Sequence, residues 1–192
     1  MKILGLDISS ISTGWSIIDQ EEISYGLITN DPKDSLITKI KNFGQSLENI
    51  LYENKDIKWI GIEDIYNNNT NTIKTLSKFA GVALYCIRNN LFISDIYDDI
   101  SLEKAFCMKR KAPPTCGVIT ISPSQVLKFI DMKNVADRDE KKTEVMAWAN
   151  NHFNLNLTIE QNDISDSLAI SVGVKNRLER HLKNGDIIRD RT

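Results

Sequence analysis

Four acidic residues occupy positions where an ordinary structural role is costly. Asp7 ends a short apolar run, and Glu63 ends a second run that is nearly all apolar. Asp163 and Asp166 stand three residues apart at the start of the last helical segment, so both side chains project from one helix face. An unpaired carboxylate at the end of a buried strand costs several kcal/mol. The four acids therefore indicate one shared site.

Phosphodiester hydrolysis is the chemistry that suits such a cluster. Mg²⁺ takes oxygen ligands and keeps several of its waters, so a few carboxylates are enough to bind it. Two ions about 3.5–4 Å apart can activate the attacking water and stabilise the leaving oxygen. We expect Asp7 to lie between two Mg²⁺ ions, with Glu63 on one of them. Asp163 and Asp166 are expected to bind the other ion, and Mn²⁺ to substitute for Mg²⁺.

Each acid also has a simpler interpretation. A single Asp at a strand end is more often a turn or capping residue. Asp163 is a candidate N-cap of the last helix, with Asp166 as an acid in its first turn. Asp64, next to Glu63, is expected to point to the opposite face of its strand and to be solvated. Four acids in this order along the chain still favour the joint site.

The elements that must position these acids follow from the apolar pattern. Expected strands are 2–7, 14–19, 23–29, 56–63 and 118–122. Expected helices are 35–51, 73–88, 123–130, 140–153 and 163–182. Three adjacent strands followed by alternating helices and strands predict an α/β domain with a mixed sheet. This order is typical of the RNase-H-like fold, with a central five-stranded mixed sheet flanked by helices.

Size and charge distribution fit a single nuclease domain. The 192 residues, 41% of them hydrophobic, suffice for one core. The segment 92–117 has no clear pattern and is expected to be an irregular insertion. It carries the basic run Lys109, Arg110 and Lys111, which we expect to contact DNA phosphates. Further positive charge lies in 128–142 and after Lys175, including Arg177, and is a candidate DNA-facing surface or otherwise a solvated helix face.

Several other classes are disfavoured. The chain has no apolar run of about 18 residues, so no membrane span is expected, and no secretory signal is recognisable. The odd set Cys86, Cys107 and Cys116 indicates reduced thiols and a cytoplasmic protein, in the host cytoplasm if it is phage-encoded. A zinc site from Cys107, Cys116 and His152 or His181 fits no standard spacing.

Five segments together carry a resemblance to a known family. They are Ile3-Leu-Gly-Leu-Asp7 with Thr13-Gly14, Ile62-Glu63-Asp64-Ile-Tyr66, Leu76 to Ala83 with Gly81, Glu140-Lys-Lys-Thr-Glu144-Val, and Asp163-Ile-Ser-Asp166-Ser-Leu-Ala169. The chain resembles the RuvC family of Holliday-junction resolvases, in a phage-type form. The resemblance implies a magnesium-dependent endonuclease of DNA recombination and repair that cuts four-way junctions as a homodimer.

The resemblance also implies roles for individual residues. The four metal-binding acids fall on Asp7, Glu63, Asp163 and Asp166. Tyr66 would insert at the junction centre, Lys142 matches an active-site lysine, and Lys128 matches another with a one-residue offset. Alternatively, Tyr66 is an ordinary aromatic residue at the rim of the site, and Lys142 and Lys128 are solvated lysines on their helices. The helix 73–88 would form the dimer interface.

Three other functions remain to be weighed against junction resolution. One is a broader branched-DNA or replication-fork nuclease, and another is a junction-binding protein without catalysis. The third is that of a sugar kinase or actin-like ATPase. The first phosphate-binding strand of those proteins is similar to Leu4-Gly-Leu-Asp7 with Ser12-Thr13-Gly14. Those proteins need a second phosphate loop, and no second glycine-rich loop is present in the sequence.

Overall fold

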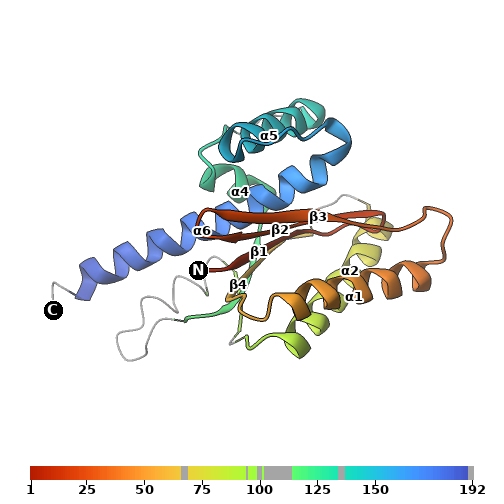
Figure 1. Cartoon of the computed structure of the whole chain (residues 1–192), viewed down its shortest axis with the longest axis horizontal. Helices are drawn as coiled ribbons and strands as arrows, with labels where there is room; N and C mark the ends of the chain where they lie inside the picture. Colours follow the sequence, from red (N-terminus) through yellow and green to blue (C-terminus); the bar gives the residue numbers. More distant parts are fainter. Residues whose placement is uncertain (66–68, 94, 99–100, 102–113, 134–136, 190–192) are drawn as a thin grey trace.

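A computed structural model describes residues 1–65, 69–93, 95–98, 101, 114–133 and 137–189 (Figure 1). For residue 138 and residues 183–189 it describes the backbone alone. Within this part of the chain, no helix is long and apolar enough to cross a membrane.

The described strands form one mixed sheet in the order β3-β2-β1-β4-β6-β5. The strands are β1 Ile3–Asp7, β2 Ser12–Asp19, β3 Glu22–Thr29, β4 Trp59–Glu63, β5 Ile96–Tyr97 and β6 Gly117–Ile121. The first three strands pair antiparallel, whereas β1, β4, β6 and β5 run parallel. This is the predicted mixed sheet of an α/β fold.

The predicted count of five strands was one too low. The sixth strand, β5, is two residues long and pairs with β6 through Ile96–Val118 and Tyr97–Ile119. It lies inside the segment 92–117 that was expected to be irregular. Two residues between acidic neighbours give no measurable alternation, so the sequence pattern could not reveal this strand.

The helices agree with the expected positions and extend further at several ends. They are α1 Leu36–Glu53, α2 Thr70–Asn90, α4 Pro123–Phe129, α5 Arg138–Phe153 and α6 Asn162–Arg189, with a 3₁₀ turn at Ile159–Gln161. α2 starts earlier than expected because Asn69 caps it, accepting hydrogen bonds from the backbone N–H groups of Asn71 and Thr72. α5 starts earlier because Asp137 caps it in the same way, accepting from Asp139 and Glu140.

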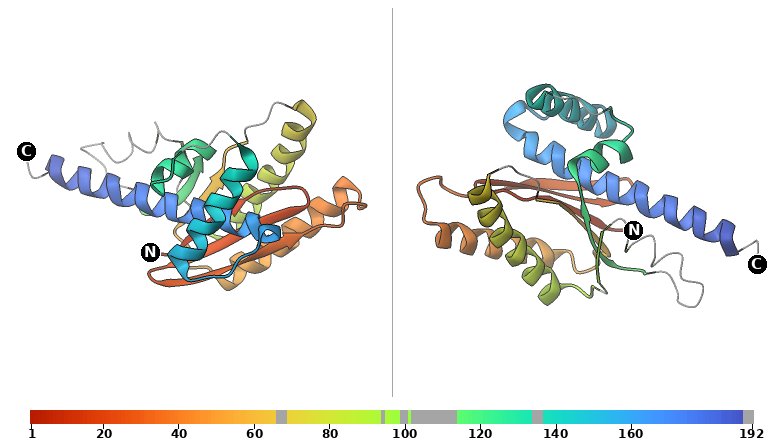
Figure 2. Two further views of the ribbon diagram at one scale, coloured as in Figure 1. Left: turned by 90° about the horizontal axis from the view of Figure 1, so that it is seen from above. Right: turned by 180° about the vertical axis from the view of Figure 1, so that it is seen from behind.

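The sheet separates two helical layers (Figures 1 and 2). α1 and α2 cover one face, where Leu4 and Leu6 of β1 pack in one apolar cluster with Phe43 and Phe79. α6 crosses the other face, and α4 and α5 pack against α6. Side chains alternate along a strand, so Ile3 points to this second face and packs with residues of α6. Asp7 lies on the same face as Ile3.

Arg177 departs from the expected basic surface. Its side chain is only 1% exposed, and its guanidinium lies over the ring of Phe129 at 5.8 Å from the ring centroid. Including Arg177 among the solvent-facing basic residues was therefore wrong. The residue lies one position from the buried Leu178, on the side of α6 that α4 covers.

Candidate active site

The site is built on a close contact between α6 and the glycines of the sheet. Gly5 precedes Asp7 by two residues and shares its face of β1. A Cβ atom on Gly5 would lie 2.3 Å from the backbone oxygen of Ser167 in α6. Any side chain at residue 5 would therefore push α6 away from β1. Gly61 has the same role on β4, where a Cβ would lie 2.6 Å from Cγ2 of Ile170.

Gly14 brings the beginning of α6 to the end of β1. It is the strand partner of Asp7 across the β1–β2 pair. A Cβ on Gly14 would lie 1.8 Å from the backbone oxygen of Asp163, a distance that real atoms do not reach. The first turn of α6 can therefore lie directly on β2 beside Asp7. The G-x-D start and the Thr13-Gly14 pair, each a weak motif alone, are thus parts of one packing arrangement.

The strand register brings the second acid beside the first. β1 and β4 are parallel and Leu6 is paired with Ile62, so Asp7 and Glu63 follow at adjacent strand ends. Both side chains lie on the α6 face, because they follow Gly5 and Gly61 by two residues. Three elements, β1, β4 and α6, therefore supply the four predicted acids.

Three of the acids are close enough to bind one cation. Asp7, Asp163 and Asp166 each offer a carboxylate oxygen, and these oxygens all lie within 4.8 Å of one another. α6 begins at Asn162, so Asp163 lies inside the first helical turn and not at the N-cap. Its Oδ1 accepts a hydrogen bond of 2.8 Å from the Asn162 side-chain amide. The helix dipole favours negative charge at this end of α6.

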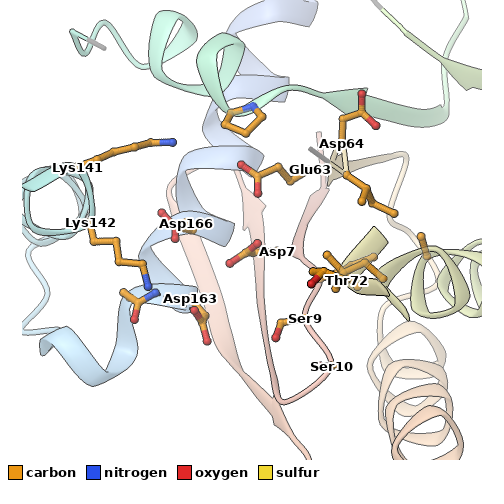
Figure 3. Close-up of a pocket in the computed structure, with 16 residues that line it drawn as sticks. Asp7, Ser9, Ser10, Glu63, Asp64, Thr72, Lys141, Lys142, Asp163 and Asp166 are labelled. Carbon is orange, nitrogen blue, oxygen red and sulfur yellow. Dashed lines mark hydrogen bonds between the residues drawn. The ribbon is translucent and has the colours of Figure 1, made fainter. Parts of the chain in front are cut away.

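Glu63 completes the group on the other side of Asp7 (Figure 3). All four acids line one cavity of about 590 Å³, together with Ser9, Ser10, Thr72, Asn162 and other residues. Asp64 also borders this cavity, but its side chain is exposed and points away from the other carboxylates, as the alternation along β4 predicts. The fourth predicted acid therefore belongs to the same cavity as the three close ones.

Burial and mutual repulsion disfavour the ionised form of the acids in this cavity. Burial raises the pKa of Asp7 well above its usual range, and the charges of Glu63, Asp166 and Asp163 raise it further. Burial raises the pKa of Glu63 to about 7, helped by the Asp166 charge. Burial likewise raises the pKa of Asp166 to about 6. Without a cation, these carboxyl groups therefore stay protonated to higher pH than they would in water.

Two lysines from the first turns of α5 face this cluster. Lys141 lowers the pKa of Glu63 and of Asp166, in opposition to burial. Lys142 lowers the pKa of Asp7 and, less strongly than Lys141 does, the pKa of Asp166. Both lysines line the cavity. Lys142 was a sequence-based candidate, whereas Lys141 was not, because adjacent lysines in a helix ordinarily point to solvent.

The remaining candidates lie outside this cavity or outside the described residues. Lys128 is exposed in the last turn of α4 and does not line the cavity, so its DNA contact stays a prediction. Tyr66 and the basic run Lys109, Arg110 and Lys111 fall in ranges that the structure does not describe. Most of the expected insertion 92–117 falls in such ranges too.

The donor set fits a hard divalent cation. Among the residues that the structure describes, Asp7, Asp163 and Asp166 are the only group of three or more potential ligands from His, Cys, Asp and Glu. Their donors are all carboxylate oxygens, which Mg²⁺, Mn²⁺ and Ca²⁺ prefer and which zinc sites rarely use alone. Cys116 is a buried free thiol, and Cys107 lies outside the described residues.

Comparisons with known proteins agree with this architecture. No family model matches the chain. Two curated relatives, the crossover junction endodeoxyribonucleases RuvC of Orientia tsutsugamushi strains Boryong and Ikeda, are each 30% identical over 119 residues. That match covers 58% of this chain and 74% of each relative.

Solved structures show the same fold at low sequence identity. The RuvC of Thermus thermophilus, solved in complex with a Holliday junction substrate, has a TM-score of 0.67 at 11% identity and covers 94% of this chain and 96% of its own. The yeast mitochondrial Holliday junction resolvase has a TM-score of 0.54 at 12% identity, covering 99% of this chain and 84% of its own.

The sheet order and the crossing of α6 define a domain of the RNase-H-like fold, with an acidic cavity at the strand ends. Within that fold class, the chain belongs to the RuvC family of crossover junction endodeoxyribonucleases.

Proposed function

We propose that this chain resolves four-way DNA junctions by metal-dependent hydrolysis of two opposed phosphodiester bonds. The observation that carries the proposal is the gathering of Asp7, Glu63, Asp163 and Asp166 in one cavity of a RuvC-family fold. The curated relatives are named as crossover junction endodeoxyribonucleases, and the Thermus thermophilus structure holds a Holliday junction. Retention of all four acids favours an active enzyme over a protein that only binds junctions.

The carboxylates are proposed to hold two Mg²⁺ ions, for which Mn²⁺ substitutes. When bound, such ions activate the attacking water and stabilise the leaving oxygen of an in-line displacement. Asp7 lies between Glu63 on one side and the Asp163–Asp166 pair on the other, which suits a ligand shared by both ions. Glu63 would bind one ion, and the pair would bind the other. Lys142, whose side chain extends toward the start of α6, is placed to neutralise charge on the phosphate (Figure 3).

Two opposed cuts are most simply made by a homodimer with two-fold symmetry. We place its interface on α2. The side chain of Tyr85 is 65% exposed on this helix, and nothing lies within 4 Å of the position that a Cβ on Gly81 would take. An exposed glycine inside a helix costs about 1 kcal/mol relative to alanine and leaves room for a second helix to approach.

The DNA-facing surface is proposed to include residues beyond the cavity. Lys128 is exposed at the end of α4 and is available to a phosphate. Tyr66 and the run Lys109, Arg110 and Lys111 are proposed as further contacts on the grounds of sequence. The whole chain is proposed to act as one nuclease domain, with an insertion at about 92–117 that includes the short strand β5.

The proposal is tested by incubating a labelled, mobile four-way junction with the protein and Mg²⁺ and mapping the nicks. We expect paired, symmetric nicks in opposed strands, no nicks in excess EDTA, and binding with little turnover in Ca²⁺. Equal cleavage of forked and nicked duplexes would support the broader branched-DNA nuclease instead. Junction binding without nicks in either Mg²⁺ or Mn²⁺ would contradict the proposal.

A further inference from the structure

The first turns of α5 present two cations to the carboxylate cluster. Val145 is buried, and it lies four residues after Lys141 and three after Lys142. Residues at these spacings share one side of a helix, so both lysines project from the side that packs toward α6. Glu140, Thr143 and Glu144 are exposed, while both lysines are partly covered and line the cavity.

The two lysines reach opposite ends of the row of acids (Figure 3). The Lys142 side chain extends toward the start of α6, where Asp163 and Asp166 lie. The Lys141 side chain extends toward Glu63, at the end that β4 forms. Lys141 faces Glu63 and Asp166, whereas Lys142 faces Asp7 and Asp166, so the two ammonium groups approach the cluster at different places.

In the described part of the chain, neither lysine has an ion-pair partner within 4.0 Å. Among the described residues, the ion pairs within 4.0 Å are Met1–Asp19 and Lys2–Asp56, both outside the cavity. Lys141 therefore faces Glu63 and Asp166 from a longer distance, across the space of the cavity. An ammonium group has three N–H donors and no acceptor, and phosphate oxygens are among its best partners.

The other nearby lysine cannot take this place. Lys128 is exposed and lies outside the cavity lining. Leu127, next to it on α4, is only 2% exposed and packs in the apolar cluster formed with α6. On the described surface of α4, the side that turns toward α6 is therefore apolar. Among the residues that the structure describes, both lysines that line the cavity come from α5.

We propose that Lys141 is a catalytic residue that contacts a non-bridging oxygen of the cleaved phosphate on the Glu63 side of the cavity. This inference rests on the proposed function and names a residue of the same site. Lys141 and Lys142 together would hold the phosphate between them from opposite ends of the carboxylate row. The ammonium of Lys141 would offset the negative charge that grows on the phosphate oxygens during displacement.

The test is single-turnover cleavage of a four-way junction by excess protein in Mg²⁺. Lys141→Gln removes the charge and is expected to slow cleavage about a hundredfold, as the loss of a key electrostatic group typically does. Lys141→Arg keeps the charge and should restore the rate to within about tenfold of the parent. Lys41→Gln is the matched control, because Lys41 is exposed on α1 behind the opposite face of the sheet; this variant should cleave like the parent.

A second readout separates a phosphate contact from damage to the metal site. Mn²⁺ binding to the DNA-free protein is measured by calorimetry. Removing a cation next to the carboxylates should leave Mn²⁺ affinity unchanged or raise it, because a repulsion is lost. A Lys141→Gln variant that binds Mn²⁺ much more weakly would overturn the proposal, since its slow cleavage would then come from disturbed carboxylates.

The outcomes distinguish this inference from the function on which it rests. If the parent nicks junctions and Lys141→Gln nicks them within about threefold of the parent rate, the role of Lys141 is overturned and the proposed function stands. If the parent binds Mn²⁺ and leaves junctions intact, the proposed function fails and takes this inference with it. Slow cleavage by Lys141→Gln with unweakened Mn²⁺ binding and rescue by arginine supports the role.

Discussion

The two faces of the central sheet are built in opposite ways. On the α1–α2 face, large apolar side chains such as Leu4, Leu6 and Phe43 interlock in one continuous cluster. On the α6 face, Gly5 and Gly14 admit backbone atoms of α6, and carboxylates follow at the strand ends. The first face stabilises the fold by burying apolar area. The second uses close backbone contact to hold the acids in position. Burying these like charges lowers the stability of the fold, and the apolar burial on the first face offsets that loss.

The largest expected effect comes from adding a side chain at a glycine on the α6 face of the sheet, which we call the tight face. Gly14→Ala places a Cβ where the backbone oxygen of Asp163 lies, at 1.8 Å, so the first turn of α6 must move. Displacing catalytic groups by about 1 Å can cost on the order of 10²-fold in rate, and overpacking costs about 1–3 kcal/mol of stability. We expect junction cleavage to be lost and the unfolding midpoint in urea to fall.

A glycine on the α1–α2 side of the sheet provides the control for this prediction. A Cβ on Gly44 of α1 would meet Cγ1 of Val82 at 3.2 Å, a side-chain contact that can relax. Alanine is also about 1 kcal/mol better than glycine inside a helix. Gly44→Ala should therefore change stability by less than about 1 kcal/mol and leave cleavage intact. Equal damage from both variants would show that the two faces do not differ as described.

The next effect concerns charge on the tight face. Asp166→Asn keeps the size of the side chain and removes one of the proposed anionic ligands, so cleavage should slow by at least about a hundredfold. Junction affinity should hold or increase, because phosphate contacts come mainly from lysine and arginine. The melting temperature without metal should hold or rise, because a like-charge repulsion is removed. Near-parental nicking by this variant would reduce Asp166 to a first-turn helix acid.

The raised pKa values of the cluster predict how metal-free stability depends on pH. The pKa of Glu63 is raised to about 7 and that of Asp166 to about 6. Between pH about 4 and 7 the folded chain therefore keeps protons that the unfolded chain has lost. The stability from these groups is complete below pH about 4 and is lost as the pH rises through 6 and 7.

We therefore expect the EDTA-treated protein to unfold at lower urea concentration at pH 8 than at pH 5.5, with a change of about 1–3 kcal/mol. Mg²⁺ should reverse this loss at pH 8, because it binds the ionised carboxylates of the folded state. A double variant, Glu63→Gln with Asp166→Asn, removes two of the titrating groups and should flatten the pH dependence. An unchanged pH dependence in that variant would place its origin elsewhere in the chain.

The smallest effect concerns a polar contact within the tight face. The hydroxyls of Ser16 on β2 and Ser171 on α6 lie 3.0 Å apart and are buried. Ser171→Ala leaves the Ser16 hydroxyl with one partner fewer, which should cost about 1–2 kcal/mol. The Ser16→Ala, Ser171→Ala double variant should cost less than the sum of the single changes. Strict additivity in this double-mutant cycle would show that the two hydroxyls do not interact.

The sequence predicted the parts of the site that depend on local pattern. Asp7 and Glu63 follow buried runs, and Asp163 and Asp166 share a helix face, so their convergence could be expected from the fold order. Lys141 could not be foreseen in the same way. Its inward direction depends on how α5 packs on α6, and that packing is set by contacts distant in sequence. Arg177 was misjudged for the same reason, because α4 covers it.

The close contacts of the glycines were also beyond local pattern. Gly5 and Gly61 lie in short apolar strands, where a glycine by itself signals only a weak strand or a close approach of some other segment. Which segment approaches is decided by the crossing of α6, more than a hundred residues later in the chain. β5 was missed because two residues carry no periodicity.

The central claim is that α6, pressed onto the glycines of the sheet, completes a cation site with the strand-end acids. Its most direct test is a crystal of this protein soaked in Mn²⁺, with anomalous diffraction data collected at the manganese edge. We expect an anomalous peak within about 2.0–2.3 Å of carboxylate oxygens from Asp7, Asp163 and Asp166. Absence of a peak among these three residues, at a Mn²⁺ concentration that supports junction cleavage in solution, would contradict it.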